Sequence, residues 1–102
     1  MAKLYLSEYA GMAHQWAGAE QIAAPQEPAI FVQTPVAIGG GSLQSAAFNG
    51  ATRVIRVHTD AICSVKIGAN PTATADDKRM AANTTEYFGV VPGDKIAVIT
   101  NT

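Results

Sequence analysis

Few side chains in this sequence have the chemistry of a catalytic or metal-binding group. The two histidines, His14 and His58, lie far apart and lack the spacing of a metal-ligand pair. Asp76 and Asp77 are adjacent carboxylates, but they fall in a polar segment where a solvated turn is the expected structure. These patterns predict no metal site and no bound cofactor.

The single cysteine, Cys63, follows closely after His58, and such a pair could act as nucleophile and base. Side chains alternate between the two faces of a strand, and the odd-numbered positions between Arg53 and Gly68 carry the apolar residues. Cys63 is therefore predicted to face the core, as a small buried hydrophobe, and His58 to face the opposite side. Because no catalytic constellation emerges, we expect a protein without enzymatic activity.

Composition indicates one domain, residues 1–102, with an unusually uncharged surface. Charged residues make up 15% of the chain, against about 25% in ordinary globular proteins. Either partners cover part of the surface, or the surface is neutral and polar. A net charge of −1 with scattered basic residues predicts no binding to nucleic acid or to a membrane surface. With no signal-peptide core and one cysteine, synthesis in a reducing cytoplasm is expected.

Short apolar segments separated by turn residues predict an all-β fold. We expect a β-sandwich or a jelly-roll-like barrel of short antiparallel strands. In the segment Ala29–Ile38, Pro35 removes a ladder donor and marks an edge strand or a break. The segment Gly68–Thr85 is polar and is predicted to form a long loop. In a small domain, a long ordered loop is typical of a functional or contact surface.

Two segments near the C-terminal half carry the clearest strand pattern. A three-residue loop at 59–61 would pair Val57 with Cys63 and keep one face apolar, although the two strands could instead lie in opposite sheets. Pro92-Gly93 is the signature of a type II turn, and a loop there would pair Val90 with Ile96. Together these patterns predict one core: Ile55, Val57, Cys63, Val65, Phe88, Val90, Ile96 and Val98.

The last strands, within residues 86–102, are apolar on both faces. We expect them to lie between two layers of the fold, or between the core and another subunit.

Residues 10–28 form an irregular N-terminal arm in this interpretation. The apolar residues Met12, Trp16 and Ile22 are too sparse for a helical stripe, so the arm is either a short helix or an extended segment. Trp16 either docks on a partner or folds back on its own domain. We take Met12, Trp16 and Ile22 as the candidate partner-binding residues.

Several strings of the sequence are distinctive: "LYLSEYAG" and "PQEP" near the start, "QSAAFN" (44–49), "RVHTDAICSVKIGANPTAT" (56–74) and "RMAANTTEYFGVVPGDKIAVITNT" (79–102). On these strings the chain resembles a family of small structural proteins of tailed-bacteriophage virions. The resemblance covers most of the chain, with residues 10–24 the least matched. It implies a component of the phage particle, made in the host cytoplasm, and it assigns no functional residues.

The resemblance and the low charge lead to three functional hypotheses. The first is a capsid cement or decoration protein on the outer head, which binds the major capsid protein or other virion subunits as a homo-oligomer, with a trimer favoured. The second is a ring-forming tail, connector or fibre-associated subunit. The third is a soluble, host-directed binding module. The number of copies per virion separates them: hundreds for a head decoration, a dozen or fewer for a connector and none for the third.

Overall fold

A computed structural model describes residues 2–14 and 21–102 of the chain, and these form eleven β-strands. The strands are β1 (Lys3–Tyr9), β2 (Met12–His14), β3 (Gln21–Pro25), β4 (Phe31–Val32), β5 (Val36–Ala37), β6 (Leu43–Gln44), β7 (Val54–Thr59), β8 (Cys63–Gly68), β9 (Lys78–Met80), β10 (Thr84–Gly89) and β11 (Lys95–Thr100).

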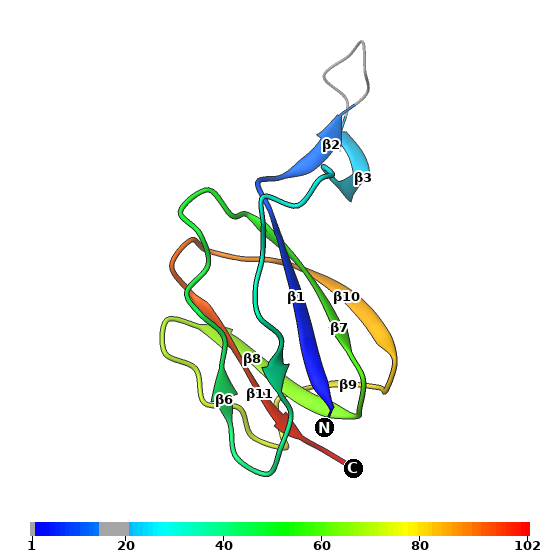
Figure 1. Ribbon diagram of the computed structural model, residues 1–102, viewed down its shortest axis with the longest axis vertical. Coiled ribbons are helices and arrows are strands. Elements are labelled where there is room, and N and C mark those ends of the chain that lie inside the picture. The colour runs from blue at the N-terminus through cyan, green and yellow to red at the C-terminus, as the bar shows by residue number, and fades with distance from the viewer. Residues whose placement is uncertain (1, 15–20) are drawn as a thin grey trace.

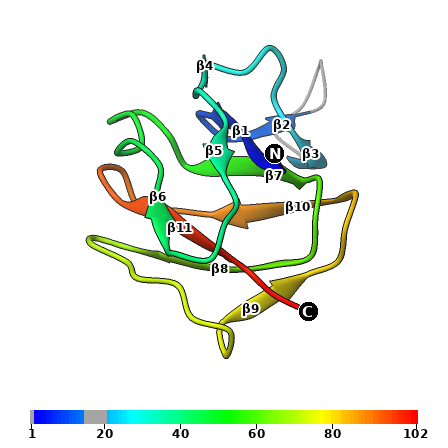
Figure 2. The ribbon, with the colours of Figure 1, turned by 60° about the horizontal axis from the view of Figure 1, so that its bottom comes forward.

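Two antiparallel sheets pack face to face as a β-sandwich (Figures 1 and 2). Sheet I has the order β10-β7-β1-β4, with β5 also paired to β1, and sheet II has the order β6-β11-β8-β9. The predicted all-β fold is confirmed, in its sandwich form. The chain crosses between the sheets after β5, β6, β7, β9 and β10, so strands that are neighbours in sequence often lie in opposite sheets.

One edge of sheet I is broken as Pro35 predicts. β4 pairs with β1 through Ser7 opposite Val32, whereas β5 pairs through Leu4 opposite Val36. Three residues, 33–35, separate Val32 from Val36, whereas only two residues separate their partners on β1. The edge strand therefore accommodates one extra residue around Pro35. The edge of sheet I therefore consists of two short pieces with a gap between them.

Both preferred strand pairings are wrong, and for residues 53–68 the alternative, two strands in opposite sheets, is correct. β7 pairs with β1 and β10, and β8 pairs with β11 and β9, so Val57 and Cys63 lie in opposite sheets. Val90 and Ile96 are likewise separated between the sheets. The turn between them is type II as predicted, with Gly93 at φ 87° and a hydrogen bond from Asp94 N to Val91 O of 3.1 Å. It joins the two layers rather than two paired strands.

The core forms between the inward faces of the two sheets. Six of the eight predicted core residues are buried, and Phe88 and Val90 pack against them partly buried. The remaining buried members come from β1, β5, β9 and the loops: Leu4, Leu6, Val36, Ile38, Phe48 and Met80. Burial of such large apolar side chains stabilises the sandwich by about 1.5–3 kcal/mol for each residue.

Residues 69–77, within the predicted long loop, cover part of the outer face of sheet II, where Lys66 stays exposed. Pro71 and Ala73 are buried, and Ala73 N donates to Ser42 Oγ at 2.8 Å. Asn101 Nδ2 fixes the same loop by donating to Ser64 Oγ at 2.6 Å and to Ala75 O at 3.1 Å. The loop also contacts Gln44 and Ser64 on either side of β11, and Ala97 is fully buried between them. The second apolar face of the last strands is therefore covered within the fold at Ala97, whereas Tyr87 of β10 is exposed.

The N-terminal arm is more regular than its sequence suggests. β2 and β3 pair as an antiparallel two-stranded sheet, which projects from one end of the sandwich (Figure 1). A hydrogen bond from Gln26 N to Gly11 O of 3.0 Å closes the base of the hairpin, and the chain rejoins sheet I where Ile30 N donates to Glu8 O at 2.8 Å. Small residues such as Ala13, Ala23 and Ala24 give these strands no hydrophobic alternation, which explains why the sequence pattern missed them.

Candidate binding face

The outer face of sheet I is open, in contrast to the partly covered outer face of sheet II. Its outward side chains form cross-strand rows over β4, β1, β7 and β10. We call this set the open face; it consists of Tyr5, Ser7, Val32, Arg56, His58, Thr85 and Tyr87. Tyr5 is 41% exposed, Tyr87 52% and Val32 65%.

One row of the open face is held by side-chain contacts. Tyr5, His58 and Thr85 are opposite one another on three neighbouring strands. His58 Nδ1 and Thr85 Oγ1 form a hydrogen bond of 2.9 Å, and the rings of Tyr5 and His58 lie tilted with their centroids 6.3 Å apart. These contacts fix the rings without burying them, so the row presents a rigid aromatic surface to solvent.

The next row carries Arg56, with Ser7 on one side and Tyr87 on the other. Arg56 is half-buried and lines a groove of about 560 Å³, together with Tyr5, Val32, Pro35, His58 and Asp60. The groove lies over the β1 edge where Pro35 interrupts the edge strand.

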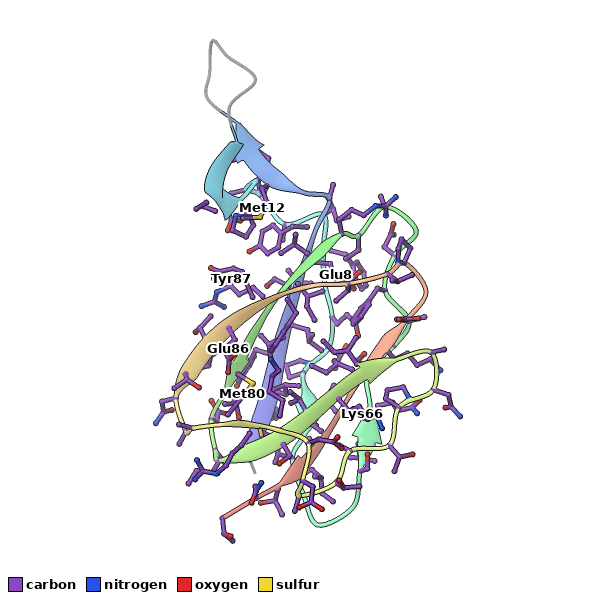
Figure 3. All side chains as sticks on the ribbon, turned by 180° about the vertical axis from the view of Figure 1, so that it is seen from behind. Glu8, Met12, Lys66, Met80, Glu86 and Tyr87 are labelled. Carbon is purple, nitrogen blue, oxygen red and sulfur yellow. The ribbon has the colours of Figure 1, made fainter. Side chains whose placement is uncertain are left out.

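At the upper end of the open face, Tyr9 joins sheet I to the arm. The Tyr9 hydroxyl donates to Glu27 Oε2 at 2.9 Å, and the ring is nearly buried. Burial raises the pKa of Tyr9 above its ordinary value of 10.0, and the hydrogen bond to Glu27 raises it further, while the charge of Arg56 opposes the rise. Figure 3 shows Met12 at the base of the hairpin and Tyr87 below it, on the side that the open face occupies.

A buried carboxylate fixes β4 and the following loop beneath this face. Glu8 is fully buried and its carboxylate accepts three hydrogen bonds, from Gln33 Nε2 at 2.9 Å, from Asn49 N at 2.8 Å and from Thr52 Oγ1 at 2.6 Å. Gln33 also accepts from Ala46 N at 3.0 Å through its Oε1. The three donors compensate the desolvation of the charge and link β1 to two loops far away in sequence.

The sequence analysis missed Glu8, although a signal for it is present. Leu4 and Leu6 mark the even positions of the first strand as inward, and Glu8 continues that parity. An inward carboxylate needs buried donors, so the same alternation that predicts the strand also predicts a polar cluster around Glu8.

Of the three candidate partner-binding residues, the structure places only Met12 in full. Met12 lies partly buried in β2 and pairs with Pro25 of β3. Ile22 lies in β3, without a described side chain, and Trp16 lies outside the described residues. Their partner-binding role stays a prediction.

The candidate chemical groups of the sequence are dispersed. Cys63 is fully buried, its Sγ lies 3.4 Å from Thr59 Oγ1, and burial raises the pKa of its thiol. His58 faces the opposite side of sheet I, as the alternation predicts. Asp77 accepts hydrogen bonds from Thr74 N and Oγ1 within a turn, as expected for a loop carboxylate. Within residues 2–14 and 21–102, no three His, Cys, Asp or Glu side chains gather as a metal site would require.

Comparison with protein-family models, with curated proteins and with solved structures finds no match for this chain. Over the described part of the chain, no helix has the length and apolar character needed to cross a bilayer. The arrangement of the open face is therefore the main guide to function.

Proposed function

We propose that the protein is a structural component of a tailed-bacteriophage virion, which binds the outer surface of the head as a cement or decoration protein. In this role it binds the major capsid protein or adjoining subunits through the open face of sheet I. The protein acts as a homo-oligomer, with a trimer favoured, so that one assembly bridges several capsid subunits.

The observation that carries this proposal is the difference between the two outer faces of the sandwich. The protein's own loop covers part of sheet II, with Pro71 and Ala73 buried, whereas sheet I leaves the aromatic rings of Tyr5 and Tyr87 about half exposed. Both faces belong to one small domain with few charges, so the open one is the natural place for a partner.

The side chains of the open face also have the composition of a protein-binding surface. Tyrosine and arginine are enriched at interfaces, and the residues that contribute most to binding are commonly Tyr, Trp and Arg. Here Tyr5, Arg56 and Tyr87 lie on three adjacent strands, on a rigid sheet that needs little reordering on binding. The projecting hairpin extends the surface beyond the sandwich, and residues 10–28 are the second contact element of the proposal.

The resemblance to virion structural proteins gives the proposal its biological setting, and the number of copies per particle tests it. Quantitative mass spectrometry of purified particles should find hundreds of copies, and particles without the protein should lose their DNA at a lower temperature. A dozen or fewer copies would support a ring-forming tail, connector or fibre-associated subunit instead. Absence from the particle would overturn both assignments.

A further inference from the structure

The groove beside Arg56 has an unused positive charge at its floor. Arg53 provides the comparison, because its guanidinium donates to Gly50 O at 3.3 Å and to Thr52 O at 3.1 Å, whereas Arg56 has no such acceptor among the described residues. Arg56 is half-buried and lines the groove. A guanidinium without an acceptor favours a ligand that supplies one.

Two acidic side chains, Asp60 in the groove and Glu27 at the arm end of the open face, already have donors of their own. Glu27 accepts from the Tyr9 hydroxyl at 2.9 Å, and Asp60 accepts from Lys3 N at 3.3 Å. His58 also lines the groove, and its Nδ1 atom already shares a hydrogen bond with Thr85. Arg56 is therefore a positively charged donor of the groove that no described side chain engages, and the hydroxyls of Tyr5 and Ser7 line the same groove.

The walls of the groove define what surrounds that group. Tyr5, Val32 and Pro35 are apolar surfaces around the charge, and Tyr87 lies next to Arg56 on β10. Asp60 also lines the groove, and its negative charge repels a doubly charged phosphate. A single carboxylate next to an apolar side chain matches these features.

We propose that this groove binds an Asp or Glu side chain of a protein partner, with the carboxylate on Arg56 and a neighbouring apolar residue against Tyr5, Val32 and Pro35. The planar guanidinium offers two parallel N–H donors to a carboxylate. This inference rests on the proposed function for the identity of the partner, a virion subunit, but the chemistry of the groove does not depend on it.

The first test uses no virion and observes the groove directly. The probe is the peptide acetyl-Val-Glu-Val-amide, titrated into the full-length ¹⁵N-labelled protein while the arginine Nε–Hε and backbone resonances are recorded by NMR. We expect shifts at the Arg56 Nε–Hε resonance and at backbone resonances around the groove, and the backbone shifts should be lost with Arg56→Gln. The matched peptide acetyl-Val-Gln-Val-amide should bind at least about tenfold more weakly. Equal binding of both peptides, no shift at Arg56, or stronger shifts with inorganic phosphate would overturn the proposal.

The second test uses phage particles that lack the protein, and measures attachment of purified variants. Arg56→Gln should weaken attachment at least about tenfold, and Arg56→Lys should restore part of it because lysine keeps the charge but not the two-donor geometry. Arg53→Gln is the matched control and should attach like the wild type. Attachment of Arg56→Gln at wild-type strength overturns the carboxylate site but leaves the proposed function standing. Failure of the wild-type protein to attach overturns the proposed function, while the peptide titration still decides the chemistry of the groove.

Discussion

Replacing Thr52 by valine should destabilise the protein markedly, although it removes a single oxygen atom. Thr52 is fully buried, and its hydroxyl donates to the buried Glu8 carboxylate at 2.6 Å. Valine has nearly the same shape, so the main loss is one hydrogen bond to a charged group, about 1.5–3 kcal/mol. We expect the free energy of unfolding to fall by about 2 kcal/mol, which for a domain of this size lowers Tm by about 8–16 °C.

The assay is urea unfolding followed by far-ultraviolet circular dichroism, with the slope of free energy against urea checked to be unchanged. Thr85→Val is the matched control, since Thr85 is exposed and bonds only to the surface residue His58. It should change stability by less than about 0.5 kcal/mol. If Thr52→Val and Thr85→Val have the same small effect, the Glu8 cluster does not hold the fold as described.

Three further outcomes are expected. Ile96→Ala should lower the free energy of unfolding by about 2–5 kcal/mol, because Ile96 is fully buried in the core, whereas Val91→Ala at an exposed position should change it little in the same urea assay. The raised pKa of Tyr9 means that its contribution to stability is complete below pH 10.0 and is lost as the pH rises through the folded-state pKa, so Tyr9→Phe should flatten the alkaline decline in stability in a pH series. The Cys63 thiol should react with a disulfide reagent only as fast as the protein opens, because burial both covers it and raises its pKa; rapid reaction of the folded protein would contradict this placement.

The sequence pattern predicts the strands and the core well because both depend on alternation. Ile55, Val57, Cys63 and Val65 are buried as their parity requires. The same parity is satisfied whether two strands pair within a sheet or face each other across a sandwich, since both arrangements point the same residues into the core. Alternation alone could therefore not decide between the two, and the simpler hairpin was wrong.

The candidate site is harder to predict from sequence because it depends on which face stays uncovered. Tyr5, Arg56 and Tyr87 come from three strands that are distant in sequence, and only the sheet order brings them together. The loop that covers sheet II could not be assigned to either face from its composition. The hairpin arm lacks any alternation, whereas Glu8 could have been found from the parity of Leu4 and Leu6.

The central claim is that the open face of sheet I contacts the phage head. Oxidative footprinting with mass spectrometry, on the free protein and on the protein attached to particles, tests it directly. We predict that Tyr5 and Tyr87 become strongly protected on attachment, while Lys66, which is exposed on the outer face of sheet II, keeps its reactivity. If Tyr5 and Tyr87 react equally in both states while Lys66 is protected, the binding face has been assigned to the wrong sheet.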